Sequence, residues 1–458
     1  MNKRQPMPTQ DAALRTTNFC EVNLGYTDNQ AKLEAARCLQ CKNQPCVAGC
    51  PVNINIPAFI HLILEEQIQQ SYNIITEDNL FPAICGRVCP QEAQCERLCV
   101  RGIKGECVAI GRLERYVADH VPSCEVTTPK KLSTKIAVVG SGPAGLTCAN
   151  ELAKYGYQVT IFEALHAPGG VLMYGIPEFR LPKAIVMGEI QKLKSMGVQI
   201  IPNAIIGKTL TIDQLFEDGY QAIFLGSGAG LPRFMNIPGE QYKGVFSANE
   251  YLTRINLMKA YDSSSDTPLY PAKRVCVIGG GNVAMDAARC AIRLGANNVI
   301  IVYRRTEEEM PARVEEIEHA KEEGIQFKLL SNPIAIVANN HQEVCALECV
   351  QMKLGPLDAS NRARPIPIPE SNFQIPCDSV IMALGNYPNP LLSKETSTLQ
   401  VNSHGCFVVD HTLMTSIPGV FAGGDAVSGA ATVILAMEAG KIASQSIIQY
   451  LQQKNSST

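Results

Sequence analysis

The sequence contains no long apolar segment and carries little net charge. Its 458 residues include no uninterrupted apolar run of about eighteen, so no segment is expected to span a bilayer. The 40 Lys and Arg and 43 Asp and Glu residues leave a formal charge of −3, which gives no reason to expect nucleic acid or a membrane surface as partner. Residues 1–19 also lack the apolar core of a secretory signal. We therefore expect a cytoplasmic protein, in which disulfides do not persist.

Cysteine, by contrast, is abundant, with 18 copies in the chain. Eight of them form two regularly spaced arrays near the N-terminus. In a reducing compartment such arrays are expected to bind a metal or a cluster. The arrays read Cys38-x2-Cys41-x4-Cys46-x3-Cys50-Pro51 and Cys85-x3-Cys89-Pro90-x4-Cys95-x3-Cys99.

The spacing of these cysteines favours two 4Fe-4S clusters over structural zinc. A 4Fe-4S cluster takes most of its four thiolates from closely spaced cysteines and the last from a distant residue, and a ligand followed by proline is typical of ferredoxin-type sequences. Zinc sites built from four cysteines prefer paired C-x2-C segments, and only Cys38 and Cys41 have that spacing. Elsewhere, Cys148, Cys276 and Cys290 lie in apolar segments and are interpreted as core residues.

The chain divides into three kinds of sequence. Residues 1–125 are cysteine-rich, with amphipathic stretches at 56–69 and 108–120, and a polar linker follows at 123–134. The rest contains two strand–helix–strand units. The first is expected at 136–139, 143–155 and 158–162, and the second at 275–278, 282–294 and 299–303. We therefore predict an α/β fold with two Rossmann-like dinucleotide-binding domains of parallel sheet, preceded by an α-helical domain that carries both clusters.

The first unit has a Gly-x-Gly-x-x-Gly sequence between its strand and its helix. Gly140 permits the tight turn, Gly142 lets a pyrophosphate approach the backbone, and Gly145 lets the helix pack on the strand. The helix N-terminus favours the phosphate charge. Glu163 ends the second strand, where an acid can accept hydrogen bonds from a ribose hydroxyl.

Two later segments favour FAD as the ligand of this unit. Residues 420–426, Val-Phe-Ala-Gly-Gly-Asp-Ala, resemble the Gly-Asp motif of two-dinucleotide flavoproteins, in which the aspartate bonds the ribityl and phosphate region. Residues 381–385 resemble the strand-to-loop motif of the same superfamily, and residues 224–228 repeat it. A lone aspartate at the position of Asp425 is more often a helix N-cap. The two preceding glycines and the upstream fingerprint favour the flavin.

The second unit carries a matching fingerprint that favours NADPH. Gly279 to Ala284 follow a strand, but no acid ends the next strand, and the sequence there reads Tyr303-Arg304-Arg305. Guanidinium groups at this position suit a 2′-phosphate. The alternative is that one arginine only caps the strand end or pairs with the acids at 307–309. Together the motifs give as cofactor-binding candidates Gly140, Gly142, Pro143, Ala144, Gly145, Glu163, Gly170, Gly279, Gly281, Asn282, Val283, Ala284, Arg304, Arg305, Gly385, Gly424 and Asp425.

The Gly-Asp motif returns after the second unit, so the NADPH domain is expected to be inserted in the FAD domain. The expected boundaries are 135–250 for the first part of the FAD domain, 251–375 for the NADPH domain and 376–458 for the second part of the FAD domain. A hydride passing directly between nicotinamide and flavin needs no acid or base. No catalytic side chain is therefore assigned.

This order of motifs resembles the small (beta) subunit of bacterial NADPH-dependent glutamate synthase over nearly the whole chain. The same module occurs in the N-terminal part of dihydropyrimidine dehydrogenase and in the large subunit of the electron-bifurcating NADH-dependent ferredoxin:NADP oxidoreductase. The resembling segments are 38–51, 81–99, 110–116, 140–145, 279–284, 303–313 and 421–426.

The resemblance implies a crossed set of cluster ligands. One cluster would take Cys38, Cys41, Cys46 and Cys99, whereas Cys85 would be a bystander. The other would take Cys50, Cys89, Cys95 and a non-cysteine ligand at the position of Glu114, where relatives have glutamine or glutamate. Without the resemblance, Glu114 reads as a solvated helix acid.

The resemblance further implies a function in electron transfer. NADPH would reduce FAD, and 4Fe-4S clusters would pass the electrons to a larger catalytic subunit that forms L-glutamate from glutamine and 2-oxoglutarate, or to a small flavoprotein partner. A hetero-oligomer is therefore expected. The alternatives are a subunit of the bifurcating ferredoxin:NADP oxidoreductase, the electron-input part of a dihydropyrimidine dehydrogenase, and a scaffold with structural zinc.

Overall fold

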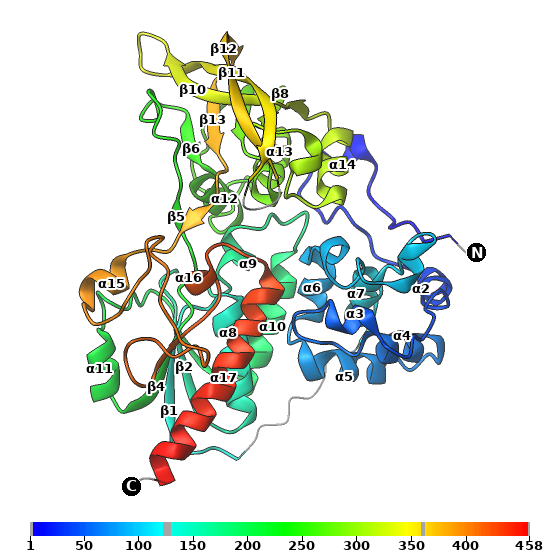
Figure 1. The fold of residues 1–458 in the computed structure, drawn as a ribbon, viewed down its shortest axis with the longest axis vertical. Coiled ribbons are helices and arrows are strands. Elements are labelled where there is room, and N and C mark those ends of the chain that lie inside the picture. The colour runs from blue at the N-terminus through cyan, green and yellow to red at the C-terminus, as the bar shows by residue number, and fades with distance from the viewer. Residues whose placement is uncertain (1–2, 122–129, 359–361, 457–458) are drawn as a thin grey trace.

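The computed structural model describes residues 3–121, 130–358 and 362–456, arranged as a helical N-terminal part and two parts that each contain a five-stranded parallel sheet (Figure 1). Most of the linker expected at 123–134 lies outside the described residues. Within the described chain, no helix combines the length and apolar character that crossing a membrane would require.

The N-terminal part consists of short helices that begin at identifiable caps. The Thr27 hydroxyl accepts a hydrogen bond from the Gln30 backbone in a capping box, and Pro45, Pro57 and Pro82 stand in the first turns of three other helices. The helices are α1 (Ala12–Arg15), α2 (Asp28–Ala35), α3 (Pro45–Ala48), α4 (Ile56–Leu64), α5 (Ile68–Asp78), α6 (Pro82–Val88) and α7 (Ile110–His120), with 3-10 turns η1 (Gln91–Ala93) and η2 (Val100–Ile103).

The first sheet has the strand order β15-β4-β1-β2-β3, with all neighbours parallel. Its strands are β1 (Lys135–Val139), β2 (Gln158–Phe162), β3 (Gln199–Ile201), β4 (Tyr220–Leu225) and β15 (Val420–Ala422). Around it lie α8 (Pro143–Lys154), α9 (Val171–Tyr174), α10 (Lys183–Ser195), α11 (Ile212–Glu217), α15 (Leu391–Glu395), α16 (Asp425–Ser428) and α17 (Val433–Ser456). Because β15 follows the whole second sheet in the chain, the second sheet is inserted into the first part, as expected.

The second sheet has the order β6-β13-β7-β8-β9 and is also parallel. Its strands are β6 (Val245–Ser247), β7 (Arg274–Ile278), β8 (Asn298–Val302), β9 (Gln326–Lys328) and β13 (Ser379–Met382), with helices α12 (Ala248–Asn256), α13 (Asn282–Arg293) and α14 (Val314–Glu322) and the turn η3 (Glu307–Glu309). Two strands therefore lie outside the expected 251–375 segment. β6 comes before it and β13 after it.

An antiparallel sheet and a pair of short strands complete the second part. The antiparallel strands are β10 (Ser331–Ala338), β11 (Val344–Leu357) and β12 (Ala363–Pro376). The short strands β5 (Leu231–Pro232) and β14 (Asn386–Tyr387) pair with each other where the chain leaves the first part and where it returns. The guanidinium of Arg233 lies 3.7 Å from the ring centre of Tyr387 at this crossing. The two connections between the nucleotide-binding parts thus run side by side.

The N-terminal helices and the first sheet share one hydrophobic core, whereas the second sheet has its own. Ile84 of α6, Phe224 of β4 and Met437 of α17 belong to the shared cluster of buried residues. Val277, Met285 and Ile301 belong to a separate one. In Figure 1, α17 and α10 stand between the first sheet and the N-terminal helices. The thiol-bearing part is therefore packed directly against the first nucleotide-binding part.

Candidate cofactor and cluster sites

The first fingerprint forms a turn in which Gly140 and Gly145 pack tightly against other backbone atoms, whereas Gly142 faces open space. Gly140 has φ +95°, and a Cβ there would lie 2.5 Å from the carbonyl oxygen of Gly226. A Cβ on Gly145 would lie 2.0 Å from the carbonyl oxygen of Gly140, so this glycine allows β1 and α8 to approach closely. Gly142, in contrast, has no atom within 4 Å of its Cβ position. The turn therefore fits a pyrophosphate at the N-terminus of α8.

Glu163 is buried directly after β2, and its side chain hydrogen-bonds to this turn. Its carboxylate accepts hydrogen bonds from the backbone N–H and the hydroxyl of Ser141 and, at 2.8 Å, from the backbone N–H of Leu165. A carboxylate offers about four acceptor positions. At least one therefore remains for the ribose hydroxyl that the sequence predicts as its ligand.

The later motifs return to the same turn. A Cβ on Gly170 would lie 2.8 Å from the Cα of Gly142, and a Cβ on Gly424 would lie 2.9 Å from the Cβ of Ala144. Asp425 begins α16, and one of its oxygens accepts a hydrogen bond from the backbone N–H of Ala431 at 3.1 Å. Burial raises the pKa of this carboxyl. The first fingerprint, Gly170 and the Gly-Asp motif thus meet at one place, and the glycine-lined opening fits FAD.

The second fingerprint repeats the geometry in the other sheet. Gly279 has φ +144°, and a Cβ there would lie 2.4 Å from the carbonyl oxygen of Ala383. A Cβ on Gly280 would strike the ring of Tyr303 at 2.7 Å. Gly281 faces open space, with its nearest neighbour 3.9 Å from the Cβ position. These contacts suit a second dinucleotide, here the nicotinamide one.

The three remaining second-fingerprint candidates lie at the start of α13. Ala284 is fully buried, whereas the Val283 side chain is 44% exposed. The side-chain oxygen of Asn282 accepts a hydrogen bond from the backbone N–H of Arg313. Ala284 therefore packs in the core, Val283 faces solvent, and Asn282 links the turn to the segment before α14.

The two consecutive arginines after β8 have different surroundings. Arg304 is exposed. Arg305 is buried, donates to the carbonyl of Ala363 at 2.7 Å and pairs with Asp358 at 2.6 Å, at the tip of the β11–β12 hairpin. The structure thus leaves Arg304 as the guanidinium open to a 2′-phosphate. Arg305 anchors the hairpin, a role that the pairing alternatives weighed from the sequence did not include.

Four cysteines from both arrays line one small cavity, which we name the outer thiol group. They are Cys38, Cys41, Cys46 and Cys99. All four are half-buried. Burial and the neighbouring thiols of Cys38 and Cys99 raise the pKa of Cys46 to about 11. This set is the one that the crossed arrangement predicts for one cluster, and the structure brings it together although Cys99 is distant in the chain.

Three buried cysteines form the inner thiol group. Cys50, Cys89 and Cys95 lie close enough to influence one another electrostatically, and Glu114 acts on all three. The Glu114 side chain is buried, accepts a hydrogen bond from the Asn79 amide at 2.5 Å, and has its pKa raised to about 8 by burial. It is therefore no solvated helix acid. Across the described ranges, no three His, Cys, Asp or Glu side chains form a group suited to a single metal ion.

Cys85 lies beside this inner group rather than apart from it. Its thiol is 1% exposed and hydrogen-bonds with that of Cys89, which is the largest influence on the pKa of Cys89 and raises it; burial acts in the same direction. Its Sγ is also 3.5 Å from the side-chain oxygen of Asn79 and 3.7 Å from the sulfur of Met437. Sequence reasoning missed Asn79 and Met437, because neither has a spacing that relates it to the cysteines.

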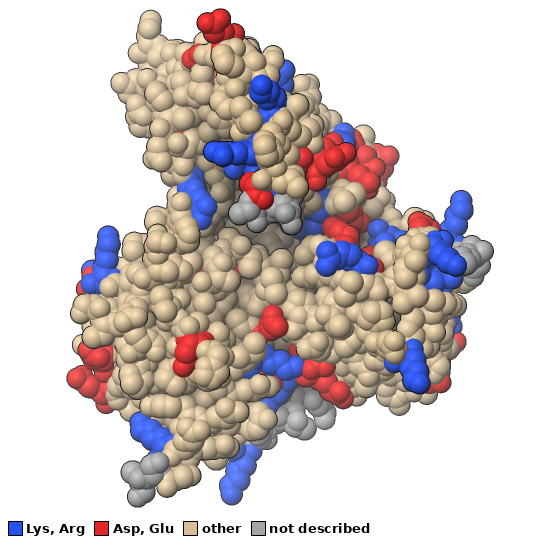
Figure 2. Space-filling model, in the orientation of Figure 1, with Lys and Arg blue, Asp and Glu red and all other residues tan. Residues whose placement is uncertain are grey.

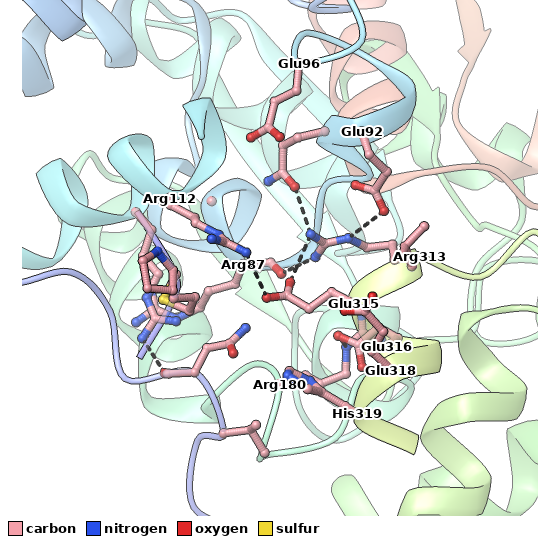
Figure 3. Close-up of a pocket in the computed structure, with 18 of the residues that line it drawn as sticks. Arg87, Glu92, Glu96, Arg112, Arg180, Arg313, Glu315, Glu316, Glu318 and His319 are labelled. Atoms are coloured by element: carbon pink, nitrogen blue, oxygen red, sulfur yellow. Dashed lines mark hydrogen bonds and ion pairs between the residues drawn. The ribbon is translucent and has the colours of Figure 1, made fainter. Parts of the chain in front are cut away.

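A charged cavity of about 570 Å³ lies where the N-terminal helices meet the second sheet part (Figure 3). Its lining includes Arg4, Arg87, Gln91, Arg180, Arg313 and Glu316. Figure 2 shows that basic and acidic side chains of the visible face gather near this junction. Ion pairs cross the boundary between the parts there, between Arg112 and Glu315 and between Arg313 and Glu92.

Comparison with known proteins agrees with both halves of the structure. Residues 15–126 match the family model of dihydropyrimidine dehydrogenase domain II, 4Fe-4S cluster, and residues 134–440 match that of pyridine nucleotide-disulphide oxidoreductase. The glutamate synthase [NADPH] small chain of Escherichia coli strain K12 is 33% identical over 461 residues, which cover 98% of each chain. The chain belongs to the glutamate synthase small-chain family. It is an oxidoreductase of the flavin and iron–sulfur type that uses FAD and NADPH, as the motifs predicted.

Further relatives widen the range of enzymes that contain this module. The small chain from Azospirillum brasilense is 36% identical over 98% of this chain and 95% of its own length. The NADP(+)-dependent formate dehydrogenase subunit beta of Moorella thermoacetica is 41% identical over 90% of this chain, but the match spans only 60% of that relative's length. Mycobacterium tuberculosis FprA in complex with NADPH superposes with a TM-score of 0.60 at 19% identity, covering 71% of this chain and 86% of FprA. The FprA match supports the fold alone.

Proposed function

We propose that this chain takes electrons from NADPH and delivers them singly to a larger partner subunit that forms L-glutamate from glutamine and 2-oxoglutarate. The observation that carries this proposal is the order of the sites. Cys85, which hydrogen-bonds with Cys89 of the inner thiol group, contacts Met437 of α17 in the flavin part, and the outer thiol group is half-buried. The two groups thus form a sequence from the flavin part to the surface.

The residues of the chain supply binding and orientation. The fingerprint at Gly140 to Gly145 holds one dinucleotide and that at Gly279 to Ala284 holds the other, and hydride transfer depends on this placement. FAD, when bound, accepts a hydride and releases electrons one at a time. The exclusion of water from the inner group follows from the burial of Cys50, Cys89 and Cys95.

We assign the outer thiol group as the ligands of one 4Fe-4S cluster, and the inner thiol group with Glu114 as the ligands of a second. The burial of Glu114 and its proximity to all three inner cysteines support this assignment. The test is the iron content and EPR spectrum of Glu114→Ala, with the exposed Glu65→Ala as control. We expect loss or conversion of one cluster in Glu114→Ala only. Eight irons and an unchanged EPR spectrum in that variant would contradict the assignment.

We assign Arg304 as the residue that selects NADPH over NADH. Removing the guanidinium in Arg304→Ala should raise the KM for NADPH at least tenfold, because a charge-assisted contact of about 1.5–3 kcal/mol is lost, and should leave the KM for NADH nearly unchanged. Arg305→Ala is the matched comparison, since its side chain holds the hairpin instead. The measurement is anaerobic flavin reduction by each nucleotide. Faster reduction of the unaltered protein by NADH would overturn this assignment.

The partner is expected to dock over the outer thiol group. Exposed apolar side chains flank its cysteines, namely Leu39, Leu98, Val100 and Ile103, together with the exposed bases Lys42, Arg97 and Lys104. This surface suits an acceptor subunit with acidic groups around its own redox centre. Reversing charge in Arg97→Glu with Lys104→Glu should slow electron delivery to the partner and leave flavin reduction by NADPH unchanged. Equal delivery by both proteins, with the same dependence on salt, would contradict this docking site.

A second candidate function is electron exchange with a formate dehydrogenase. The 41% identity to the Moorella thermoacetica subunit supports it, although that subunit is longer than this chain. Isolation of the chain with its native partner separates the candidates. Glutamine-dependent glutamate formation supports the first proposal, formate-dependent NADP⁺ reduction supports the second, and ferredoxin reduction supports the bifurcating alternative.

A further inference from the structure

Arg313 is attached by its backbone segment to the NADPH fingerprint. Its N–H donates to the side-chain oxygen of Asn282 at 2.9 Å, and the N–H of Ala312 donates to the carbonyl of Gly280 at 3.2 Å. Pro311 is the nearest neighbour of the open Gly281 position, at 3.9 Å. Any displacement of this turn by a bound phosphate is therefore transmitted to the segment that begins α14.

The side chain of Arg313 extends in the opposite direction, into the N-terminal part. One terminal nitrogen donates to the carbonyl of Arg87 and the other to the side-chain oxygen of Gln91, both at 3.0 Å. Its Nε is 3.4 Å from a carboxylate oxygen of Glu92. Figure 3 shows the guanidinium lying between Glu92 and Glu315. Arg87 precedes Cys89 and Gln91 follows it. The Arg313 guanidinium therefore hydrogen-bonds to the loop on both sides of this cysteine of the inner thiol group.

The guanidinium also acts on the inner group through its charge. Its hydrogen bonds to Arg87 and Gln91 hold this cation against the residues two positions before and after Cys89. The Arg313 side chain is 9% exposed, so water screens this interaction little. A positive charge beside a cluster stabilises the state that carries the additional electron.

We propose that Arg313 is a positioning residue that makes the electron affinity of the inner cluster depend on whether the NADPH site is occupied. This inference rests on the ligand assignment of the proposed function. Nucleotide binding at the Gly281 turn shifts the segment at 311–313. The two hydrogen bonds that the Arg313 guanidinium donates to Arg87 and Gln91 then displace the loop around Cys89. By linkage, reduction of the inner cluster changes nucleotide affinity by the same factor.

The test is an anaerobic redox titration of the full, cluster-loaded chain followed by EPR, with and without 2′,5′-ADP. This probe supplies the 2′- and 5′-phosphates of the adenosine half of NADPH and cannot transfer a hydride. The inner cluster is identified as the signal that Glu114→Ala alters. We expect the probe to shift the midpoint potential of this signal in the unaltered protein, and to change its reduced-to-oxidised ratio at fixed potential about fivefold or more. The outer cluster should not shift.

Two substitutions separate the effect of the Arg313 charge from the effect of its paired hydrogen bonds to Arg87 and Gln91. Arg313→Gln removes both, so its inner cluster should have a lower midpoint potential and should lose the response to the probe. Arg313→Lys keeps the charge without the paired donors, so its potential should stay near that of the unaltered protein while the response falls. The half-buried Arg254→Gln, which removes a cation that pairs with Glu250 of α12, should behave as the unaltered protein.

The outcomes distinguish this inference from the proposed function. If Glu114→Ala alters no EPR signal, the ligand assignment has failed. If it does alter one, but the probe leaves that signal unshifted in the unaltered protein, the inference about Arg313 is wrong. An undiminished response in Arg313→Lys also overturns it, and this variant decides the matter if Arg313→Gln does not retain its clusters.

Discussion

The second and third glycines of the first fingerprint, Gly142 and Gly145, have opposite surroundings and should respond differently to the same substitution. In Gly145→Ala the added carbon meets the backbone oxygen of Gly140 at 2.0 Å, which cannot move aside as a side chain would. We expect destabilisation by about 1–3 kcal/mol or more. In Gly142→Ala the carbon enters open space. That protein should fold normally but lose flavin, because the pyrophosphate needs this position.

Thermal unfolding and bound-flavin absorbance measure the two effects separately. A Gly142→Ala protein that is as unstable as Gly145→Ala would contradict the prediction, and so would one that retains a full complement of flavin.

Lys183 should make stability depend on pH in the alkaline range. Burial lowers the pKa of its amine from 10.5 to about 8, although the charge of Glu178 opposes the shift. At this amine the folded state therefore binds fewer protons than the unfolded state between these values, so the contribution of Lys183 to stability should increase as pH rises from about 8 to 10.5. The amine donates to the carbonyls of Ile176 and Leu181, so a neutral lysine remains hydrogen-bonded. Lys183→Met should remove this contribution, so the difference between the unfolding midpoints of the two proteins should change over this pH range. A difference that stays constant from pH 8 to 10.5 would contradict the prediction.

The role of a single residue can be predicted from the sequence where that role depends on local geometry. Gly140, Gly142 and Gly145 are recognisable because a phosphate-binding turn needs them at fixed spacing. The partners of Arg305 are not recognisable, because Asp358 is brought to it by a hairpin whose register depends on tertiary packing. Cys85 has regular spacing, but its contact with Met437 depends on where α17 packs.

The contact between α6 and α17 joins the thiol-bearing part to the flavin part. Met437 is fully buried and its sulfur lies 3.7 Å from the thiol of Cys85. Met437→Ala should reduce the free energy of unfolding by about 2–5 kcal/mol, because it leaves a cavity in the shared core. It should also slow electron passage from flavin to cluster, measured by stopped-flow absorbance. Leu435→Ala, which is on the same helix but 40% exposed, is the control and should change little.

The elements were predicted well where the repeat was local and less well where strands pair over long distances. The strand at 158–162 and the helix beginning at 143 lie where their patterns place them. The stretch at 56–69 is two helices, because α4 ends at Leu64 and Glu66 takes φ +61° before α5 begins. The NADPH-domain boundaries expected at 251 and 375 leave β6 and β13 in the FAD domain, although both strands pair in the second sheet. These two strands are short, and only their pairing with each other and with β7 shows where they belong.

A buried network of ion pairs joins the three parts of the molecule. Arg289 of the second sheet part is fully buried and pairs with Glu316 and Glu323. Arg180 from the first part also pairs with Glu316, and Arg15 from the N-terminal part pairs with Glu323. Burial would raise the pKa of Glu323, but Arg293 and Arg289 outweigh it and lower the pKa to about 2.

Removal of the central cation should therefore be costly to the whole molecule. Arg289→Met leaves two buried carboxylates without their shared partner and should cost about 3–5 kcal/mol in the free energy of unfolding. Removing the half-buried surface cation that pairs with Glu250, in Arg254→Met, should cost less than about 1 kcal/mol. Denaturant unfolding of the two proteins measures both. A similar cost for each substitution would mean that the network contributes no more than a surface pair.

The ion pair between Arg15 and Glu323 also has a consequence for the time course of synthesis. The two residues are 308 positions apart, and Arg15 leaves the ribosome first. At about 5–20 residues per second, its acidic partner follows roughly 15–60 seconds later. During that interval the first helix of the nascent chain has no docking site. The N-terminal segment therefore reaches its final position only after most of the inserted domain has been translated.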